Sequence, residues 1–317
     1  MIIQIYEIQT PGEAEKCIEL GVDHLGSVLL SQDEWRLQVL REVTRMSERA
    51  DVKTGLIPLF QHPDTLYRVI DYYRPNYIHF CESLTGAEGR EVELTRFIEI
   101  QSSLKQRFPE IGIMRSIPIP ESGSASQLPS VRLVKALEPF SDVFLIDTWL
   151  GKEPVAGYVG ITGITGDREA AKNVVLQSGI PVILAGGLSP ENVREAILEV
   201  LPAGVDSCTQ TNCVDEAGKP LRFKKDFQKV EKFVKEIQNA EAQIKIRRDD
   251  LEKKMGYLKA ELREREASLP AHSVRPQQLL AIEELEDEIV VTERQIEDLK
   301  KVFKGGRNDS GGGPGKN

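Results

Sequence analysis

The sequence predicts a (β/α)8 barrel followed by a helical hairpin. Eight short apolar or β-branched segments recur before residue 237, and amphipathic segments lie between them. Parallel strands that are buried on both faces read as continuous apolar runs, so eight such runs alternating with helices are typical of this barrel. Beyond Asp226 the apolar residues keep a helical spacing instead, which predicts the hairpin. An open, doubly wound sheet is the competing architecture for the first part.

The predicted strands are short and rich in valine, isoleucine and leucine. Branched side chains of this kind favour extended backbone, and glycine, proline or polar residues bound the runs. The strands are predicted at residues 2–8, 23–30, 52–60, 76–81, 111–119, 142–148, 181–187 and 204–211.

The segments between the strands carry signals that begin a helix. "TPGEAEKCIELG" opens with a threonine that can cap the first turn and a proline that suits its first position. "SPENVREAILEVL" repeats this chemistry, with Glu191 and Asn192 in the first turn. Helices are also predicted at "DTLYRVIDYYRP", "EVELTRFIEIQSSLKQRF" and "DREAAKNVVLQSG".

The C-terminal part of the chain predicts two antiparallel helices. One long helix begins near Asp226, "SLPAHSVRP" at 268–276 interrupts it with two prolines, and a second apolar seam follows. Because the link is short, the second helix can only return along the first. The predicted domains are a barrel at 1–237, a coiled-coil hairpin at 238–304 and a flexible, glycine-rich tail at 305–317.

Composition indicates a soluble, acidic protein. The chain has 317 residues and is 40% hydrophobic, and it has no run of about 18 apolar residues that could span a membrane. A net charge of −9 disfavours binding to the phosphates of nucleic acid. The four cysteines and four histidines are scattered, which predicts no metal site. The N-terminus lacks the features of a signal peptide, so we expect a cytoplasmic protein.

The residues just after the strands form the site in a barrel of this kind. The segment "PVILAGGLSPENVREAI" ends a predicted strand with Gly186 and Gly187, which let the backbone approach a ligand closely. Leu188 follows, and Ser189 and Pro190 begin the predicted helix, whose free N–H groups suit a phosphate. The simpler alternative is a tight turn with a good cap.

Two further segments supply polar groups at the same end of the barrel. "GVDSCTQTN" offers Ser207, Cys208 and Thr209, because the loops after the seventh and eighth strands often share a phosphate. In "FLIDT", Asp147 follows an apolar run, and apolar surroundings would raise its pKa into the range of a general acid. A capping role for Asp147 is the alternative.

Together these segments resemble the phosphoribosylanthranilate isomerase family. The resemblance rests on "PVILAGGLSPENVREAI" followed by "GVDSC", on "FLIDT", and on the loop "GITGITG". "VKTGLIPLFQHPDTLYRVIDYYRPNYIHFCE" is similar to the third and fourth strand region of the family, and "GKPLRFKKDFQKVEKFVKEI" is similar to its end. The resemblance covers residues 1–237 and implies the same barrel fold.

The resemblance implies an Amadori rearrangement of a phosphorylated ribosylamine, without a cofactor. In that reaction an acid protonates the ring oxygen, and a base removes the C2′ proton of the resulting iminium. Asp147 falls on the family's acid, and Arg36 falls near an arginine that anchors the substrate. The family's base is a cysteine, and Tyr6 stands in its place. Tyr6 is therefore one candidate base. Cys81, at the mouth of the fourth predicted strand, is the other.

Two functions stay open from the sequence. The resemblance favours an isomerase that binds a phosphorylated small molecule, whereas Tyr6 at the position of the base favours a non-catalytic phosphosugar-binding barrel. In either case the two-helix hairpin has a narrow core, so we expect it to pair two copies of the chain. A hairpin that packs only on itself is the simpler alternative.

Overall fold

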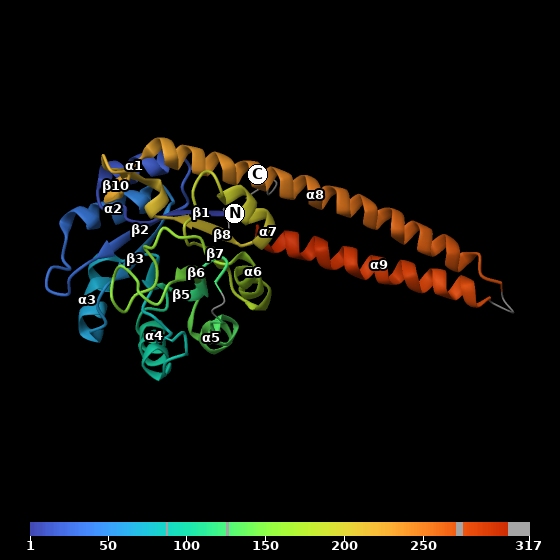
Figure 1. The fold of residues 1–317 in the computed structure, drawn as a ribbon, viewed down its shortest axis with the longest axis horizontal. Coiled ribbons are helices and arrows are strands. Elements are labelled where there is room, and N and C mark those ends of the chain that lie inside the picture. Colours follow the sequence, from blue (N-terminus) through green and yellow to red (C-terminus); the bar gives the residue numbers. More distant parts are fainter. Residues whose placement is uncertain (87, 125–126, 271–274, 304–317) are drawn as a thin grey trace, which may run out of the picture.

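Eight parallel strands close into a barrel in the computed structural model, which describes residues 1–86, 88–124, 127–270 and 275–303 (Figure 1). Each strand pairs with the next one along the chain, and β1 closes the barrel against β8. The predicted (β/α)8 fold is confirmed, and each predicted strand overlaps an observed one. The strands are β1 (Ile2–Ile5), β2 (His24–Leu29), β3 (Lys53–Pro58), β4 (Tyr77–Phe80), β5 (Gly112–Pro120), β6 (Val143–Trp149), β7 (Val182–Leu184) and β8 (Gly204–Ser207).

Helices cover the outside of the barrel. Two of them, α2 and α5, lie outside the predicted segments, and neither Leu37 nor Pro129, which precede them, offers a capping side chain. No helix of the described residues is long and apolar enough to cross a membrane. The helices around the barrel are α1 (Pro11–Glu19), α2 (Gln38–Arg49), α3 (Pro63–Tyr73), α4 (Thr95–Arg107), α5 (Ser130–Leu137), α6 (Arg168–Gln177) and α7 (Val193–Val200).

A short hairpin of two strands follows β8. The 3-10 turn η2 (Thr209–Thr211) leads into β9 (Asn212–Val214), which pairs with the antiparallel strand β10 (Pro220–Lys225). A second 3-10 turn, η1 (Glu138–Phe140), follows α5. The β9–β10 hairpin matters for the site because its residues reach the end of β1, as described below.

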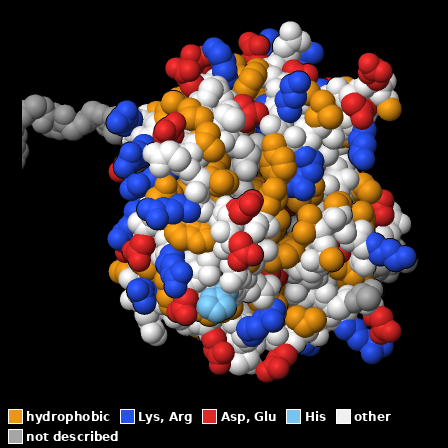
Figure 2. Space-filling model, turned by 90° about the vertical axis from the view of Figure 1, so that its left-hand side faces the viewer, with side chains coloured by type: hydrophobic (Ala, Val, Ile, Leu, Met, Phe, Trp, Pro, Cys, Tyr) orange, Lys and Arg blue, Asp and Glu red, His pale blue; other side chains and the backbone are white. Residues whose placement is uncertain are grey.

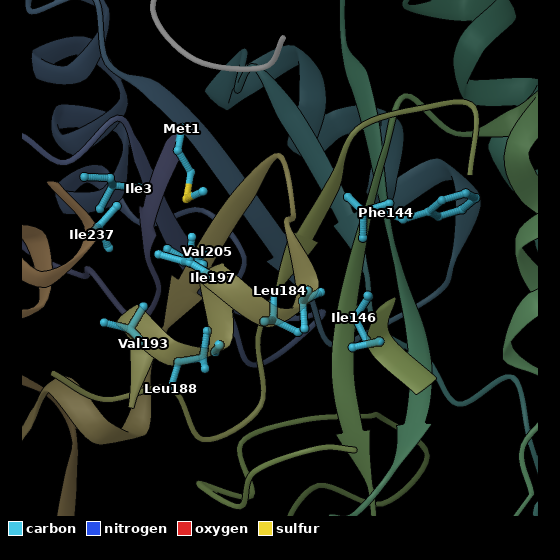
Figure 3. Packing of buried hydrophobic residues seen from close by; sticks show 14 of the residues in the cluster. Met1, Ile3, Phe144, Ile146, Leu184, Leu188, Val193, Ile197, Val205 and Ile237 are labelled. Carbon is cyan, nitrogen blue, oxygen red and sulfur yellow. The ribbon is translucent and has the colours of Figure 1, made fainter. Parts of the chain in front are cut away.

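Two apolar layers stabilise the barrel. Inside it, Ile2, Met114 and Leu145 pack in one cluster with Tyr6. Outside it, the strands and helices share a larger cluster, part of which Figure 3 shows around β1, β8 and α7. Each fully buried side chain of this size contributes about 1.5–3 kcal/mol relative to an exposed one. The interior is thus a packed core, and the site lies above it at the ends of the strands.

The barrel and the hairpin share one helix. α8 (Phe227–Ala267) runs unbroken past residue 237, and α9 (Pro276–Lys301) returns along it (Figure 1). The first part of α8 buries Phe233 in the barrel's outer cluster, and α9 brings Leu299 and Val302 back into the same cluster. Farther out, Met255 and Leu258 pack with Leu285, Ile289 and Ile296. The link at 268–276 lies partly outside the described residues, and the tail at 305–317 lies wholly outside them.

Candidate active site

Two adjoining cavities open at the carboxyl ends of the strands. The larger, of about 530 Å³, is rich in apolar side chains, and the smaller, of about 290 Å³, lies beside the turn that follows β7. Asp147, Ile161, Asp206 and Cys208 line both, so the cavities form two halves of one site. At the end of the molecule opposite the hairpin, hydrophobic side chains gather near the centre and charged ones surround them (Figure 2).

Asp147 lies at the junction of the two cavities, near the end of β6. Its Oδ1 accepts a hydrogen bond of 2.8 Å from the backbone N–H of Thr148. Burial nevertheless raises the pKa of the carboxyl to about 7, and the nearby charge of Glu153 adds to the rise. At neutral pH the group can therefore both donate and accept a proton.

Glycines let two loops close over Asp147. A Cβ at Gly160 would lie 2.3 Å from Asp147 Oδ2, and a Cβ at Gly187 would lie 2.6 Å from the backbone of Ile164. Both glycines also have positive φ angles, +105° and +62°, which other residues rarely adopt. The "GITGITG" loop and the turn after β7 therefore pack directly on each other, which explains why both are rich in glycine.

Tyr6 follows β1 and points into the barrel. Its ring packs over Gly26 of β2, where a Cβ would lie 2.2 Å from the ring, and its hydroxyl reaches Gly55 of β3, where a Cβ would lie 2.9 Å away. The hydroxyl lies 2.7 Å from Nδ1 of His79, and Nε2 of that histidine lies 2.8 Å from Oγ of Ser116. Tyr6 is thus part of a buried hydrogen-bond chain that crosses the barrel.

Burial keeps Tyr6 and His79 of this hydrogen-bond chain neutral. Burial raises the pKa of Tyr6 well above its usual value, and the negative charge of Asp206 adds to the rise. Burial and the charge of Arg115 lower the pKa of His79 to about 3. At neutral pH the site therefore holds a phenol and an uncharged imidazole, and neither is suited to take a proton from carbon.

Cys81, the other candidate base, directly follows β4 and lines the larger cavity. Burial raises the pKa of its thiol, and the charge of Glu82 raises it further, although Arg115 opposes the rise. A thiol is a base only as its thiolate, so Cys81 is protonated at neutral pH in this environment.

The predicted phosphate-binding residues gather around the smaller cavity, with one exception. Backbone N–H groups of Gly186, Gly187 and Leu188 donate no hydrogen bond within the described part of the chain, so they are available to an anion. Ser207 joins the two loops, because its hydroxyl donates to the carbonyl oxygen of Leu188 over 2.7 Å. The lining residues from the prediction are Gly186, Gly187, Leu188, Ser207, Cys208 and Thr209.

Ser189 is the exception, and it lies outside both cavities. The side chain of Asn192 accepts a hydrogen bond of 2.9 Å from the N–H of Ser189 and donates one of 3.0 Å to the carbonyl oxygen of Gly187. These bonds form a turn over 189–192, so α7 begins at Val193 and not at Ser189 as predicted. Phosphate binding at this end would depend on the glycine turn more than on the helix.

Arg36 also lies away from the cavities. It is exposed in the segment between β2 and α2, and its guanidinium lies 4.9 Å from the centre of the Tyr72 ring on α3. It lines neither half of the site. A role in anchoring the substrate would therefore require this segment to move.

Sequence reasoning missed a second carboxyl group, Asp206 of β8. Gln4 of β1 donates a hydrogen bond of 3.1 Å to its Oδ1. Burial raises the pKa of Asp206 to about 8, the charge of Asp147 adds to the rise, and Gln4 and Lys225 oppose it. The available signal was an acidic residue inside a short, otherwise apolar strand that ends at the predicted phosphate site.

Glu7 is another missed residue of the larger cavity. Its φ of +65° lies in the region that favours glycine, so its backbone is strained. The β9–β10 hairpin holds the carboxylate, through Arg222 Nε at 2.7 Å, Asn212 Nδ2 at 3.1 Å and the N–H of Phe223 at 3.2 Å. Although burial opposes ionisation, Arg222 and the other donors keep the pKa of Glu7 below its usual value.

Comparisons with known proteins concern the family and the fold of the chain. Residues 107–236 match the family model of N-(5'phosphoribosyl)anthranilate (PRA) isomerase. The chain is 33% identical over 200 residues to N-(5'-phosphoribosyl)anthranilate isomerase 1 of Methanosarcina mazei, a match that covers 63% of this chain and 76% of that one. The enzyme of Methanosarcina acetivorans is 32% identical over 130 residues, which are 40% of this chain and 51% of that relative.

A solved structure shares the fold of the barrel. It is a phosphoribosyl anthranilate isomerase in complex with reduced 1-(o-carboxyphenylamino)-1-deoxyribulose 5-phosphate. The match has a TM-score of 0.52 and a sequence identity of 21%. It covers 75% of this chain and 100% of the related chain. The family model, the M. mazei relative and the shared barrel lead to one conclusion: this chain belongs to the N-(5'-phosphoribosyl)anthranilate isomerase family.

Proposed function

We propose that this protein catalyses the isomerisation of N-(5'-phosphoribosyl)anthranilate, a step of tryptophan biosynthesis. The observation that carries the proposal is Asp147. Its carboxyl lies where the apolar and polar halves of the site meet, and burial raises its pKa to about 7. A carboxyl with that pKa can act as a general acid at neutral pH.

The shape of the site supports the same substrate class. The ligand named for the related structure carries a carboxyphenyl group at one end and a phosphate at the other. In this chain the larger half of the site is rich in apolar side chains, whereas the smaller half presents the free N–H groups of Gly186, Gly187 and Leu188. We therefore place the aromatic ring in the larger half, the phosphate in the smaller half and the ribose beside Asp147.

The proposed reaction begins with proton transfer from Asp147 to the ring oxygen of the ribose. The bond between C1′ and that oxygen breaks, and the nitrogen lone pair forms a C1′=N iminium. A base then removes the proton from C2′, and the electron pair of the C–H bond forms the C1′=C2′ bond of a neutral enolamine. Tautomerisation to the ketone moves one proton from O2′ to C1′ and completes the isomerisation.

Replacement of the acid tests the proposal. Asp147→Asn should lower the turnover of phosphoribosylanthranilate by about 10²–10⁴-fold, because a single positioned acid contributes that much. Binding of the reduced product analogue should change little, since asparagine keeps the shape of the side chain. Asp33→Asn, on an exposed segment, is the matched control and should turn over like the native chain. Failure of the native chain to convert this substrate, or full activity of Asp147→Asn, would refute the proposal.

A non-catalytic phosphosugar-binding barrel is the second candidate, and Tyr6 favours it. The family's base position holds a buried phenol whose hydroxyl is bonded to His79. If the barrel only binds, the native chain should bind the reduced product analogue without converting the substrate. A Tyr6→Cys variant that gains turnover would then favour this candidate, whereas turnover by the native chain would exclude it.

The hairpin supports an assembly role in either case, and we propose that its partner is a second copy of this chain. Apolar side chains remain exposed on both helices, among them Ile246 and Tyr257 of α8 and Val290 and Val291 of α9, at 56–78% exposure. Between residues 245 and 267, α8 carries eight basic and six acidic residues, whereas α9 carries eight acidic and three basic ones. Two hairpins side by side can therefore place α8 of each beside the acidic α9 of the other.

Point variants test this assembly better than truncation does. Removing α9 would uncover the barrel cluster that Leu299 and Val302 complete, so a truncated chain could fail to fold. Instead, Val290→Lys combined with Val291→Lys should convert a dimer into a monomer in light scattering. Val131→Lys, on the barrel helix α5, is the control and should leave the mass unchanged. A native chain that is monomeric at high concentration would refute the proposal.

A further inference from the structure

The proposed reaction needs a base for the C2′ proton. The positions and hydrogen bonds of the groups that line the site favour one of them. We propose that Asp206 is the residue that removes the C2′ proton, in place of the family's cysteine. This inference rests on the proposed isomerase function. It assigns the second proton transfer to a carboxylate on β8. This strand is far from Tyr6 in the sequence, but it pairs with β1, so both residues lie at the same end of the barrel.

The position of Asp206 suits this role. The residue lines both halves of the site, as Asp147 does, so the two carboxyl groups flank the place where the ribose would lie. Gln4 donates a hydrogen bond to Oδ1, whereas no described residue donates to Oδ2. The side chain is thus fixed by one oxygen and has the other available to a substrate. It is also well shielded from solvent, since the residue is 6% exposed.

The other basic groups of the larger cavity are already engaged or protonated. Tyr6 and His79 hydrogen-bond each other in the barrel interior. Glu7 is ionised, but the β9–β10 hairpin supplies donors to both its oxygens. Burial raises the pKa of the Cys81 and Cys208 thiols, so neither forms a thiolate at neutral pH.

The charges around Asp206 favour a carboxylate there once Asp147 is protonated. Asp147 on β6 raises the pKa of Asp206, so the pair avoids holding two negative charges at once. Lys225 of β10 and the Gln4 amide both stabilise the ionised form of Asp206. Within the described part of the chain, the N–H of Thr148 is the donor to Asp147, and Glu153 lies near. Burial raises the pKa of Asp206 to about 8 and that of Asp147 to about 7, so a pair that carries one proton holds it mainly on Asp206, and the proposed reaction proceeds through the minor form that carries it on Asp147.

The proton balance of the reaction fits this pair. Asp147 gives its proton to the ring oxygen when the C1′–O bond breaks, and Asp206 receives the C2′ proton when the enolamine forms. One proton has then moved from Asp147 to Asp206, and exchange with solvent through the shared site restores the starting state. The step needs no oxidant, reductant or further reactant.

Two variants of the full chain test the inference, with native turnover measured first. Asp206→Asn should lower turnover by about 10²–10⁴-fold and should still bind the reduced product analogue, because Gln4 can donate to the asparagine oxygen. Gln4→Leu removes the donor that stabilises the carboxylate, so the acidic limb of the profile of kcat/KM against pH should move to higher pH. A residue that only supports the structure would not move that limb.

The outcomes separate this inference from the function on which it rests. If the native chain turns over the substrate and Asp206→Asn stays within tenfold of it, Asp206 is not the base. An unmoved acidic limb in an active Gln4→Leu variant leads to the same conclusion. If the native chain converts nothing, the proposed isomerase function itself fails. Two results together would establish the assignment. Asp206→Asn would lose turnover but still bind the analogue, and Gln4→Leu would show the acidic limb at higher pH.

Discussion

Tyr6 offers the sharpest distinction between a structural and a catalytic residue. Tyr6→Phe removes only the hydroxyl, which lies 2.7 Å from Nδ1 of His79. His79 is 3% exposed, so without its partner one ring nitrogen is left buried and without a hydrogen bond. An unsatisfied buried polar group costs about 1–3 kcal/mol. We therefore expect Tyr6→Phe to lower the free energy of unfolding by about that amount, with turnover within a few-fold of the native chain.

Urea unfolding and steady-state turnover measure the two parts of this prediction. The matched control is Tyr67→Phe, which removes a hydroxyl that contacts Ser103 on the outside of the barrel. That hydroxyl is only partly buried, so water replaces it and the loss of stability should be below about 1 kcal/mol. A Tyr6→Phe chain that keeps its stability but loses turnover more than about 100-fold would refute the reasoning and would place Tyr6 in the chemistry.

Two further predictions concern the same site. Gly26→Ala should destabilise the fold by about 1–3 kcal/mol, because the new Cβ would lie 2.2 Å from the Tyr6 ring. The loss should shrink in a Tyr6→Ala background, and equal losses in both backgrounds would show that the two residues do not interact. Asp147→Asn should raise the free energy of unfolding by about 1–4 kcal/mol at pH 8 and should leave it unchanged at pH 4. Burial raises the pKa of Asp147 from 3.8 to about 7, so between these values the unfolded state loses the proton while the folded state keeps it, and stability falls as pH rises through that interval. Equal effects of Asp147→Asn in urea unfolding at both pH values would contradict this.

The fold could be predicted because strands and helices leave local signals in the sequence. Each barrel strand is an apolar run, and side-chain caps mark the starts of α1 and α6, where Thr10 accepts a hydrogen bond from the N–H of Glu13 and Asp167 accepts one from the N–H of Ala170. α2 and α5 lack such signals and went unpredicted. The start of α7 was misplaced by a few residues because the side chain of Asn192, and not that of Ser189, organises the turn.

The site was only partly predictable because its chemistry depends on distant partners. Asp147 and the glycine turn follow directly from their positions at strand ends. The environment of Asp206 depends on Gln4, which is 202 residues away in sequence and adjacent only because β1 pairs with β8. The orientation of Tyr6 depends on the absence of side chains at Gly26 and Gly55, on two neighbouring strands. No local pattern in the sequence reports these contacts.

The carboxyl pair of Asp147 and Asp206 argues for reorganised chemistry more than for a decayed site. Buried polar groups need hydrogen bonds for stability in any fold, so the carboxyl pair, and not the pairing around Tyr6, is what favours reorganised chemistry. Here Tyr6 has a hydrogen-bond partner in His79 and room above two glycines, and the strained Glu7 has three donors. Strain of this kind persists only where the surrounding structure supports it. In the proposed reaction, Asp147 and Asp206, which line the same two cavities, are the pair of carboxyl groups that carry the two proton transfers.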